Sequence, residues 1–176
     1  MSTSVLVGYA TRYGSTQEVA ARIAAALREC GPAVVCRPLR EVKSLDDYGA
    51  VVIGAPLYMF RWHADAKHFL GKHQQALFSR PVAVFALGPF HDDAKERQDA
   101  RAQRDKELLK FAWFKPVAIE VFGGKFDPAT LAFPYNLIPA LKTMPPSDAR
   151  DWAVIEAWAA GVAEQLQPQV GQFSVQ

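Results

Sequence analysis

The segment V-L-V-G-Y-A-T-R-Y-G-S-T, residues 5–16, decides the fold of this chain. Its first half reads as a buried strand, its second half is a turn rich in hydroxyl groups, and the good helix formers of residues 17–27 follow. The first N–H groups of a helix lack partners and carry a partial positive charge, so a turn in this position is suited to holding an anion. An N-cap formed by Ser15 or Thr16 without any ligand explains the same residues equally well.

The kind of anion is narrowed by what the turn lacks. No lysine follows it, so the loop that binds nucleoside triphosphates together with Mg²⁺ is absent. No G-x-G-x-x-G run occurs either, which disfavours the pyrophosphate of a dinucleotide. A loop lined by hydroxyls, with Gly14 for close backbone approach, suits a terminal phosphomonoester. Arg12 can add positive charge there or face solvent.

Length and composition indicate a single globular domain. The 176 residues are 50% hydrophobic and 22% charged, and we expect one domain over residues 1–167 followed by a mobile tail, residues 168–176. No apolar run is long enough to span a membrane, and the N-terminus does not resemble a signal peptide. We interpret Cys30 and Cys36 as free thiols, which suggests a reducing cytoplasm. A net charge of +2 gives no reason to expect a nucleic-acid partner.

Strand and helix patterns alternate along the chain. Five apolar runs predict strands at residues 5–9, 33–37, 50–55, 81–87 and 116–122. Helices are predicted at residues 16–28, 64–77 and 94–111, and a last helix is predicted to begin after a cap at Ser147 or Asp148. This alternation predicts an α/β fold with a doubly wound, five-stranded parallel sheet. Residues 56–62 are expected to be a loop, and the proline-rich stretch 125–146 an irregular insert before the last helix.

Ligands of such sheets bind at the carboxyl ends of the strands, where the strand order reverses. The loops after the first, third and fourth strands therefore meet at one site. Tyr58 and Phe90 in these loops can stack on a flat heteroaromatic ring, or they pack on neighbouring loops instead. His91 is a weak catalytic candidate, and no other catalytic residue is apparent. No metal site is expected, because His63, His68 and His73 do not share one helix face.

The pattern Tyr9-x-Thr11-x-x-Gly14-x-Thr16 after an apolar strand resembles the phosphate loop of flavodoxin-like proteins, which holds the 5′-phosphate of FMN. The resemblance implies FMN as cofactor and the strand order 2-1-3-4-5. It also implies that the cofactor is bound by residues of three loops. These are Thr11, Arg12, Tyr13, Gly14, Ser15 and Thr16 in the first, Pro56, Leu57, Tyr58 and Met59 in the second, and Leu87, Gly88, Pro89 and Phe90 in the third.

Beyond the phosphate loop, the chain is similar to one branch of this group, the menaquinone-dependent protoporphyrinogen dehydrogenases. Three features carry the similarity: V-V-I-G-A at residues 51–55 with Trp62-His63 after it, the turn Gly123-Gly124-Lys125 with the long insert, and D-A-R-D-W at residues 148–152. The resemblance implies oxidation of a porphyrinogen, with a quinone as the final acceptor. The apolar residues 131–144 can form a lip for a macrocycle or quinone, touch the inner face of a membrane, or cover the sheet edge or the last helix.

Two other functions stay open. A flavodoxin-type electron carrier without a substrate of its own would dock on a redox protein, usually through an acidic face, and a pI near 8.6 does not suggest one. Residues 56–62 also contain no glycine, which carriers favour beside the flavin and which the dehydrogenases tend to have where this chain has Phe60. A flavin-dependent quinone reductase would need a nicotinamide site, for which the sequence has no motif. The sequence leaves the oligomeric state open.

Overall fold

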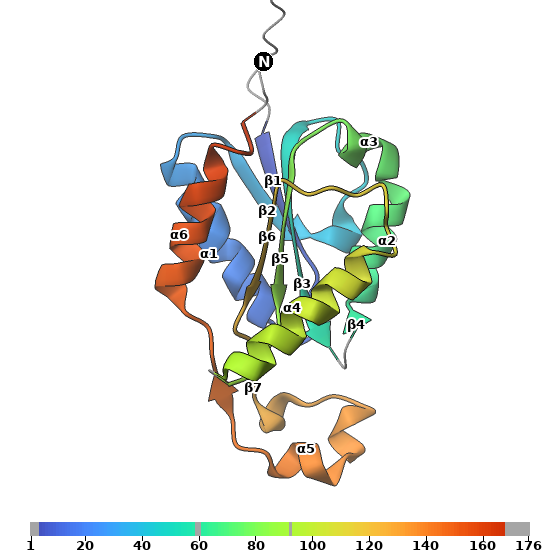
Figure 1. The fold of residues 1–176 in the computed structure, drawn as a ribbon, viewed down its shortest axis with the longest axis vertical. Coiled ribbons are helices and arrows are strands. Elements are labelled where there is room, and N and C mark those ends of the chain that lie inside the picture. The colour runs from blue at the N-terminus through green and yellow to red at the C-terminus, as the bar shows by residue number, and fades with distance from the viewer. Residues whose placement is uncertain (1–3, 59–60, 92, 168–176) are drawn as a thin grey trace, which may run out of the picture.

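The fold is an α/β sandwich (Figure 1), seen in a computed structural model that describes residues 4–58, 61–91 and 93–167. The strands are β1 (Ser4–Tyr9), β2 (Val34–Pro38), β3 (Tyr48–Tyr58), β4 (Arg61–Trp62), β5 (Val82–Leu87), β6 (Ala118–Phe122), β7 (Lys125–Phe126) and β8 (Ser147–Asp148). The α-helices are α1 (Ser15–Glu29), α2 (Ala64–Lys72), α3 (Gln74–Phe78), α4 (Ala94–Leu108), α5 (Pro139–Thr143) and α6 (Trp152–Ala163). Three short 3₁₀ helices are η1 (Leu39–Glu41), η2 (Pro128–Thr130) and η3 (Tyr135–Leu137).

The main sheet has the predicted topology. Its parallel strands lie in the order β2-β1-β3-β5-β6, and the short β4 pairs only with β3. Because the fourth and fifth predicted strands are β5 and β6, the expected order 2-1-3-4-5 is confirmed. Val7 of β1 pairs with Cys36 of β2 on one side and with Val52 of β3 on the other.

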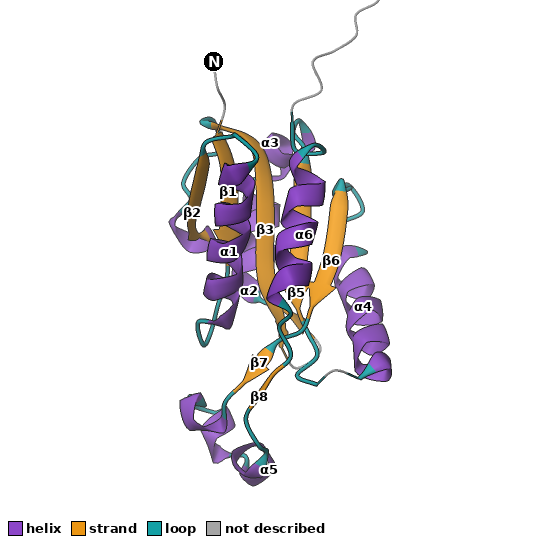
Figure 2. Cartoon of the chain, turned by 90° about the vertical axis from the view of Figure 1, so that its left-hand side faces the viewer, coloured by secondary structure: helices purple, strands orange, loops and turns teal. Residues whose placement is uncertain are grey.

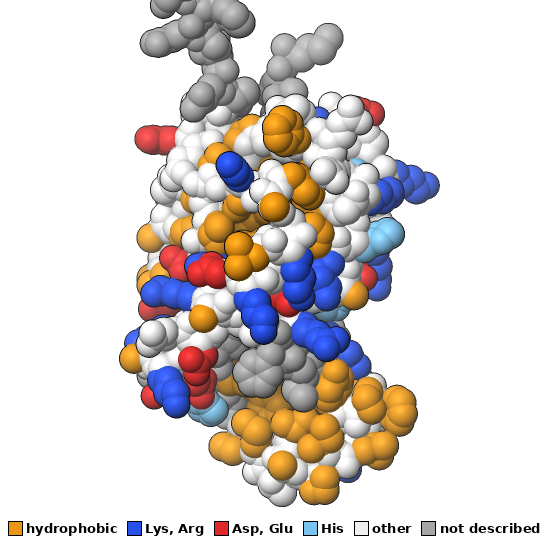
Figure 3. Space-filling view, turned by 45° about the vertical axis from the view of Figure 1, so that its right-hand side comes forward, with side chains coloured by type: hydrophobic (Ala, Val, Ile, Leu, Met, Phe, Trp, Pro, Cys, Tyr) orange, Lys and Arg blue, Asp and Glu red, His pale blue; other side chains and the backbone are white. Residues whose placement is uncertain are grey.

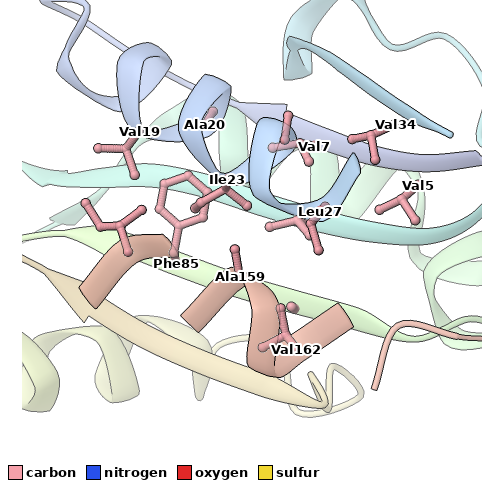
Figure 4. Packing of buried hydrophobic residues seen from close by; sticks show 14 of the residues in the cluster. Val5, Val7, Val19, Ala20, Ile23, Leu27, Val34, Phe85, Ala159 and Val162 are labelled. Atoms are coloured by element: carbon pink, nitrogen blue, oxygen red, sulfur yellow. The ribbon is translucent and has the colours of Figure 1, made fainter. Parts of the chain in front are cut away.

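Helices cover both faces of the sheet. Helices α1 and α6 lie on one face (Figure 2), while α2, α3 and α4 lie on the other. On the first face, Ile23 and Leu27 of α1 meet Ala159 and Val162 of α6 over the strands (Figure 4), and all four side chains are buried. Burial of these apolar side chains is the main favourable contribution to folding.

Gly8 in β1 has a packing reason. A Cβ at this position would lie 2.4 Å from Cδ2 of Leu39, which is itself buried. The side chain of Leu39 therefore occupies the space that a larger residue at position 8 would need.

The prediction of a plain loop at residues 56–62 was wrong. Strand β3 continues through Tyr58, and Leu57 and Tyr58 pair antiparallel with Trp62 and Arg61 of β4. The indole of Trp62 is buried, and its Nε1 donates a hydrogen bond to the carbonyl of Ala55 at 3.3 Å. This hairpin fixes the direction of the chain next to the carboxyl end of the sheet.

The single helix predicted over residues 64–77 is interrupted. Helix α2 ends at Lys72, His73 leaves helical geometry with φ −107° and ψ 19°, and α3 begins at Gln74. The ring of His73 is buried and packs 4.7 Å from the ring of Phe69. The two helices therefore meet at a buried imidazole that packs on Phe69.

The cap of the last helix lies further along the chain than Ser147 or Asp148. Asp151 is the N-cap of α6, and its carboxylate accepts a hydrogen bond from the Val154 N–H at 3.1 Å. Ser147 and Asp148 instead form β8, and the Asp148 carboxylate accepts two hydrogen bonds from the guanidinium of Arg150. The predicted cap is thus used in another interaction.

The insert, residues 125–148, forms a lobe beyond the carboxyl ends of the strands (Figure 1) and does not lie on the sheet edge or on α6. Its two ends pair as β7 and β8, with Phe126 opposite Ser147. Hydrophobic side chains gather on its outer surface (Figure 3), where Phe133 is 72% exposed and Leu137 is 65% exposed. Within the described ranges, no helix has both the length and the apolar character that crossing a membrane requires.

Candidate functional site

The phosphate turn has the geometry that an anion needs. Gly14 takes φ +91°, a left-handed conformation that favours glycine, and its N–H donates to Oγ1 of Thr11 at 2.9 Å. Helix α1 starts at the next residue with no side chain capping its N-terminus. The N–H groups of Ser15, Thr16 and Gln17 therefore have no acceptor within the helix.

Thr16 points to a ligand independently of the helix end. Its side chain is 1% exposed, and its Oγ1 has no hydrogen-bond partner among the described residues. Leaving a buried hydroxyl unpaired costs about 1–3 kcal/mol. A phosphate oxygen bound at the start of α1 would supply the missing partner.

A pocket opens between this turn, the ends of β3 and β5, and the insert. Its lining residues in the described chain are Arg12, Tyr13, Ser15, Thr16, Pro56, Leu57, Leu87, Gly88, Phe90, Gly124, Lys125, Phe126, Asp127, Thr130 and Leu131. The three loops expected to meet at one site do meet here. Thr11, Gly14 and Pro89 do not line the pocket, and Thr11 instead shapes the turn through its hydrogen bond to the Gly14 N–H.

Met59, one of the predicted cofactor residues, lies outside the described residues. Tyr58 is the last residue of β3. Its predicted role in stacking on a ring stays a prediction.

Phe90 has a packing partner. Its ring centroid lies 5.4 Å from that of Phe126 in β7, and its ring edge approaches Gly124. A Cβ at Gly124 would lie 3.5 Å from two ring carbons of Phe90, in ordinary contact. Phe90 thus forms a wall of the pocket and joins the third loop to the insert.

His91, the weak catalytic candidate, lies at the surface. Its Nδ1 is 3.0 Å from Oε1 of Glu96, and both side chains are more than 40% exposed. It does not line the pocket described above. A contact this exposed contributes little to stability.

The lining residues that sequence reasoning missed all come from one segment, residues 124–131. The predicted cofactor set stopped at the third loop, because the insert has no periodic pattern that places its side chains. A signal was present in Gly123-Gly124, two glycines directly after a strand whose carboxyl end lies at the site. A Cβ at Gly123 would lie 1.9 Å from the carbonyl oxygen of Ala149, so the chain passes there in close backbone contact.

Two arginines fasten the insert to the phosphate turn. The guanidinium of Arg12 donates to the carbonyl of Phe133 at 3.1 Å and lies 4.7 Å from the ring centroid of Tyr135.

The Arg150 side chain, 4% exposed, contacts Oε2 of Glu18 in the first turn of α1 at 2.6 Å, in addition to Asp148. Hydrogen bonds from Arg150 hold the pKa of the Asp148 carboxyl below its usual value. The same arginine offsets the negative charge that Glu18 places near the anion site.

A buried acid supports the hairpin on the other side of the pocket. Glu107 of α4 is 2% exposed and accepts hydrogen bonds from the Trp62 N–H and the Lys110 ammonium. Burial acts to raise its pKa, but these hydrogen bonds and the charges of Lys110 and Lys67 outweigh burial and lower it. The carboxylate is therefore ionised at neutral pH and ties α4 to β4.

Replacing Glu107 with glutamine should destabilise the protein at pH 7 by about 1–3 kcal/mol, because the Lys110 ammonium and Trp62 N–H lose a charged acceptor. A carboxyl group whose pKa is lower in the folded state stabilises the folded protein at pH values above its unfolded pKa of about 4.3. This stabilisation is lost as the pH falls through the folded-state pKa. Urea unfolding at pH 7 and pH 4 should show a smaller difference in stability between wild type and variant at the lower pH. Asp105→Asn, on an exposed position of the same helix, is the control. An equal effect of both variants at pH 7 would contradict the role of Glu107.

The family described as Flavodoxin domain matches residues 6–135, which include the phosphate turn and all of the parallel sheet except the first two residues of β1. The chain belongs to the flavodoxin family. FMN is therefore its cofactor, and flavin-type oxidation–reduction or electron transfer is its general chemistry.

Relatives of this flavodoxin-family chain are distant. It is 28% identical over 121 residues to protoporphyrinogen IX dehydrogenase [quinone] of Escherichia coli K12, covering 68% of this chain and 67% of the relative. A flavodoxin from the domain Archaea superposes with a TM-score of 0.58 at 13% identity, over 94% of this chain and 100% of that one. Oxidised flavodoxin 2 from Bacillus cereus gives 0.59 at 17% identity, over 93% and 99%. The two structural similarities show the fold.

Proposed function

We propose that the chain is an FMN-dependent oxidoreductase that dehydrogenates a porphyrinogen-type substrate and passes the electrons to a quinone such as menaquinone. Bound FMN would supply the redox chemistry, in which two electrons and two protons at a time pass from the substrate to a quinone and leave a quinol. Oxidation of a porphyrinogen to a porphyrin removes six electrons and six protons, so it would take three such cycles and three quinones. The chain itself binds, orients and shields the cofactor.

The observation that supports an enzyme over a carrier is the wall that the insert adds to the cofactor pocket. A carrier exchanges electrons with a docked protein and needs no enclosure beside its flavin. An enzyme that oxidises a small molecule needs a concave, largely apolar site. Phe126 and Leu131 give this wall apolar surface, and Lys125 adds a cation that can attract an acidic substrate. The similarity to the dehydrogenase of E. coli agrees with this choice.

The residues present fit the cofactor. We assign the phosphate to the turn of Thr11, Arg12, Tyr13, Gly14, Ser15 and Thr16, where the unpaired hydroxyl of Thr16 and the free N–H groups of α1 need an anion. We assign the flavin ring to the space between the second and third loops, flanked by Pro56 and Leu57 and by Leu87, Gly88, Pro89 and Phe90. The contacts predicted from the sequence for Tyr58 and Met59 are part of this proposal. Cys30 and Cys36 are free thiols, and we propose the cytoplasm as the compartment.

The test is reduction of the FMN-loaded protein by protoporphyrinogen IX in the absence of oxygen. We expect the visible absorbance of the flavin to bleach while porphyrin fluorescence rises. When menadione, a soluble naphthoquinone, is then added, the absorbance of the flavin should return. Photochemical reduction of the same sample is the control, because it shows whether the bound flavin can be reduced.

Three results would overturn the proposal. Protein that does not retain FMN would contradict the cofactor site. Flavin that light reduces but protoporphyrinogen does not would contradict the dehydrogenase. A long-lived one-electron-reduced spectrum during photoreduction, with no reaction of the substrate, would identify an electron carrier.

A further inference from the structure

A second cavity adjoins the cofactor pocket on the side of helix α4. Its lining residues include Leu57 from β3, Pro89 and Phe90 from the loop before α4, Asp99 and Ala100 from α4, and Met144 from the insert. Phe90, Leu57 and Gly88 line both the second cavity and the cofactor pocket, so they form the partition between the two.

The partition is thin at Gly88. This residue has no side chain, and a Cβ there would lie 2.9 Å from Cβ of Ala100 and 3.1 Å from Cγ1 of Val121. Helix α4 therefore lies directly against the backbone at the end of β5. A molecule in the second cavity would be separated from the cofactor pocket by little more than this backbone and the side chains of Phe90 and Leu57.

The second cavity and the cofactor pocket differ in charge. The cofactor pocket has Arg12 and Lys125 in its lining, whereas no described lining residue of the second cavity is a lysine or arginine. The rim of the second cavity holds two carboxylates, Asp99 and Glu96, and Glu96 is paired with His91. A ligand with carboxylate groups would meet negative charge here, while a neutral apolar molecule would meet the surfaces of Leu57, Phe90 and Met144.

We infer that the second cavity binds the electron acceptor, as a neutral quinone, and that the anionic porphyrinogen is excluded from it. This inference rests on the proposed function and refines it: donor and acceptor are bound on opposite sides of the Leu57–Gly88–Phe90 partition.

Met144 offers a probe of binding that does not depend on turnover. The chain has three methionines, so ¹³C-methyl labelling gives three methionine signals, and Met144→Leu assigns the relevant one. In the oxidised, FMN-loaded protein, we expect added menadione to shift the Met144 signal saturably. A Met144 signal that stays unchanged at saturating menadione would overturn the inference, whatever the enzyme assays show.

A matched pair of variants tests the same cavity kinetically. Met144→Glu places a carboxylate in the cavity wall, and Thr143→Glu adds the same charge one residue earlier, at an exposed position outside the cavity. We expect the KM for menadione to rise about tenfold in Met144→Glu, because binding of the quinone would remove water from the new carboxylate. In Thr143→Glu the KM should rise less than twofold. Both should retain wild-type FMN affinity.

The outcomes are distinct. An equal rise in KM for both variants, or none in either, would contradict the site. The two kinds of ligand are separated in the wild-type protein: protoporphyrinogen should leave the Met144 signal in place, and a saturable shift by protoporphyrinogen would assign the cavity to the acidic substrate and overturn the inference. Asp99→Asn should leave the binding of menadione unchanged, because a neutral quinone does not depend on this charge. Loss of turnover with a normal menadione shift would count against the proposed substrate and leave the cavity assignment supported.

Discussion

Replacement of Gly54 with alanine is expected to destabilise the protein by about 3 kcal/mol, which is a large part of the 5–15 kcal/mol typical of a folded domain. Gly54 of β3 pairs with Phe85 of β5, and a Cβ at Gly54 would lie 1.9 Å from Cζ of Phe85. Phe85 cannot move away, because its side chain is fully buried and packs against the rings of Phe122 and Trp158.

Urea unfolding measures the loss, and Gly71→Ala is the matched control. Gly71 lies in α2, where a Cβ would have no neighbour within 4 Å, so the same substitution should stabilise by about 0.4–1 kcal/mol. The double variant Gly54→Ala/Phe85→Leu should recover part of the loss in a double-mutant cycle. If Gly54→Ala unfolds at the urea concentration of the wild type, the ring of Phe85 does not cover Gly54.

Replacement of Thr16 with valine should weaken FMN binding about 10- to 100-fold, since a hydrogen bond to a charged group contributes about 1.5–3 kcal/mol. The shape of the side chain is nearly kept, and only the buried hydroxyl is lost. Without FMN the effect should reverse: the variant should be as stable as the wild type or more so, because an unpaired hydroxyl no longer has to be buried.

Fluorescence titration gives the two affinities, and riboflavin is the control ligand because it lacks the phosphate. Thr16→Val should leave the affinity for riboflavin unchanged. An equal loss of affinity for FMN and riboflavin would place Thr16 near the ring or the ribityl chain instead of the phosphate. An unchanged affinity for FMN would show that the Thr16 hydroxyl does not contact the cofactor.

The sequence was sufficient for the sheet and for the first loop, because both depend on local patterns. The apolar run at residues 5–9 followed by the Gly14 turn predicts β1, the turn and α1 directly. Pairing between segments that are distant in the chain is harder to predict from the sequence. Strand β4 consists of Arg61 and Trp62 alone, and its pairing with β3 depends on burial of an indole that no periodicity reveals.

The same limit applies to the ends of helices and to the insert. Asp151 caps α6 because Asp148, an equally good cap by residue type, is held by Arg150. The break at His73 depends on packing against Phe69, and residues 124–131 join the pocket through contacts such as Phe90 with Phe126. Each of these depends on a partner distant in sequence or on tertiary packing, so residue type and spacing alone do not determine it.

The pairing of β7 with β8 brings the two ends of the insert together, with Lys125 opposite Asp148 and Phe126 opposite Ser147. A segment whose ends already meet can be lengthened, shortened or exchanged at small cost in loop-closure entropy, and the strands beneath it need not move. The insert can therefore be altered without disturbing the sheet or the phosphate turn, so that binding of the cofactor and the shape of the outer wall of its pocket can be changed separately by mutation.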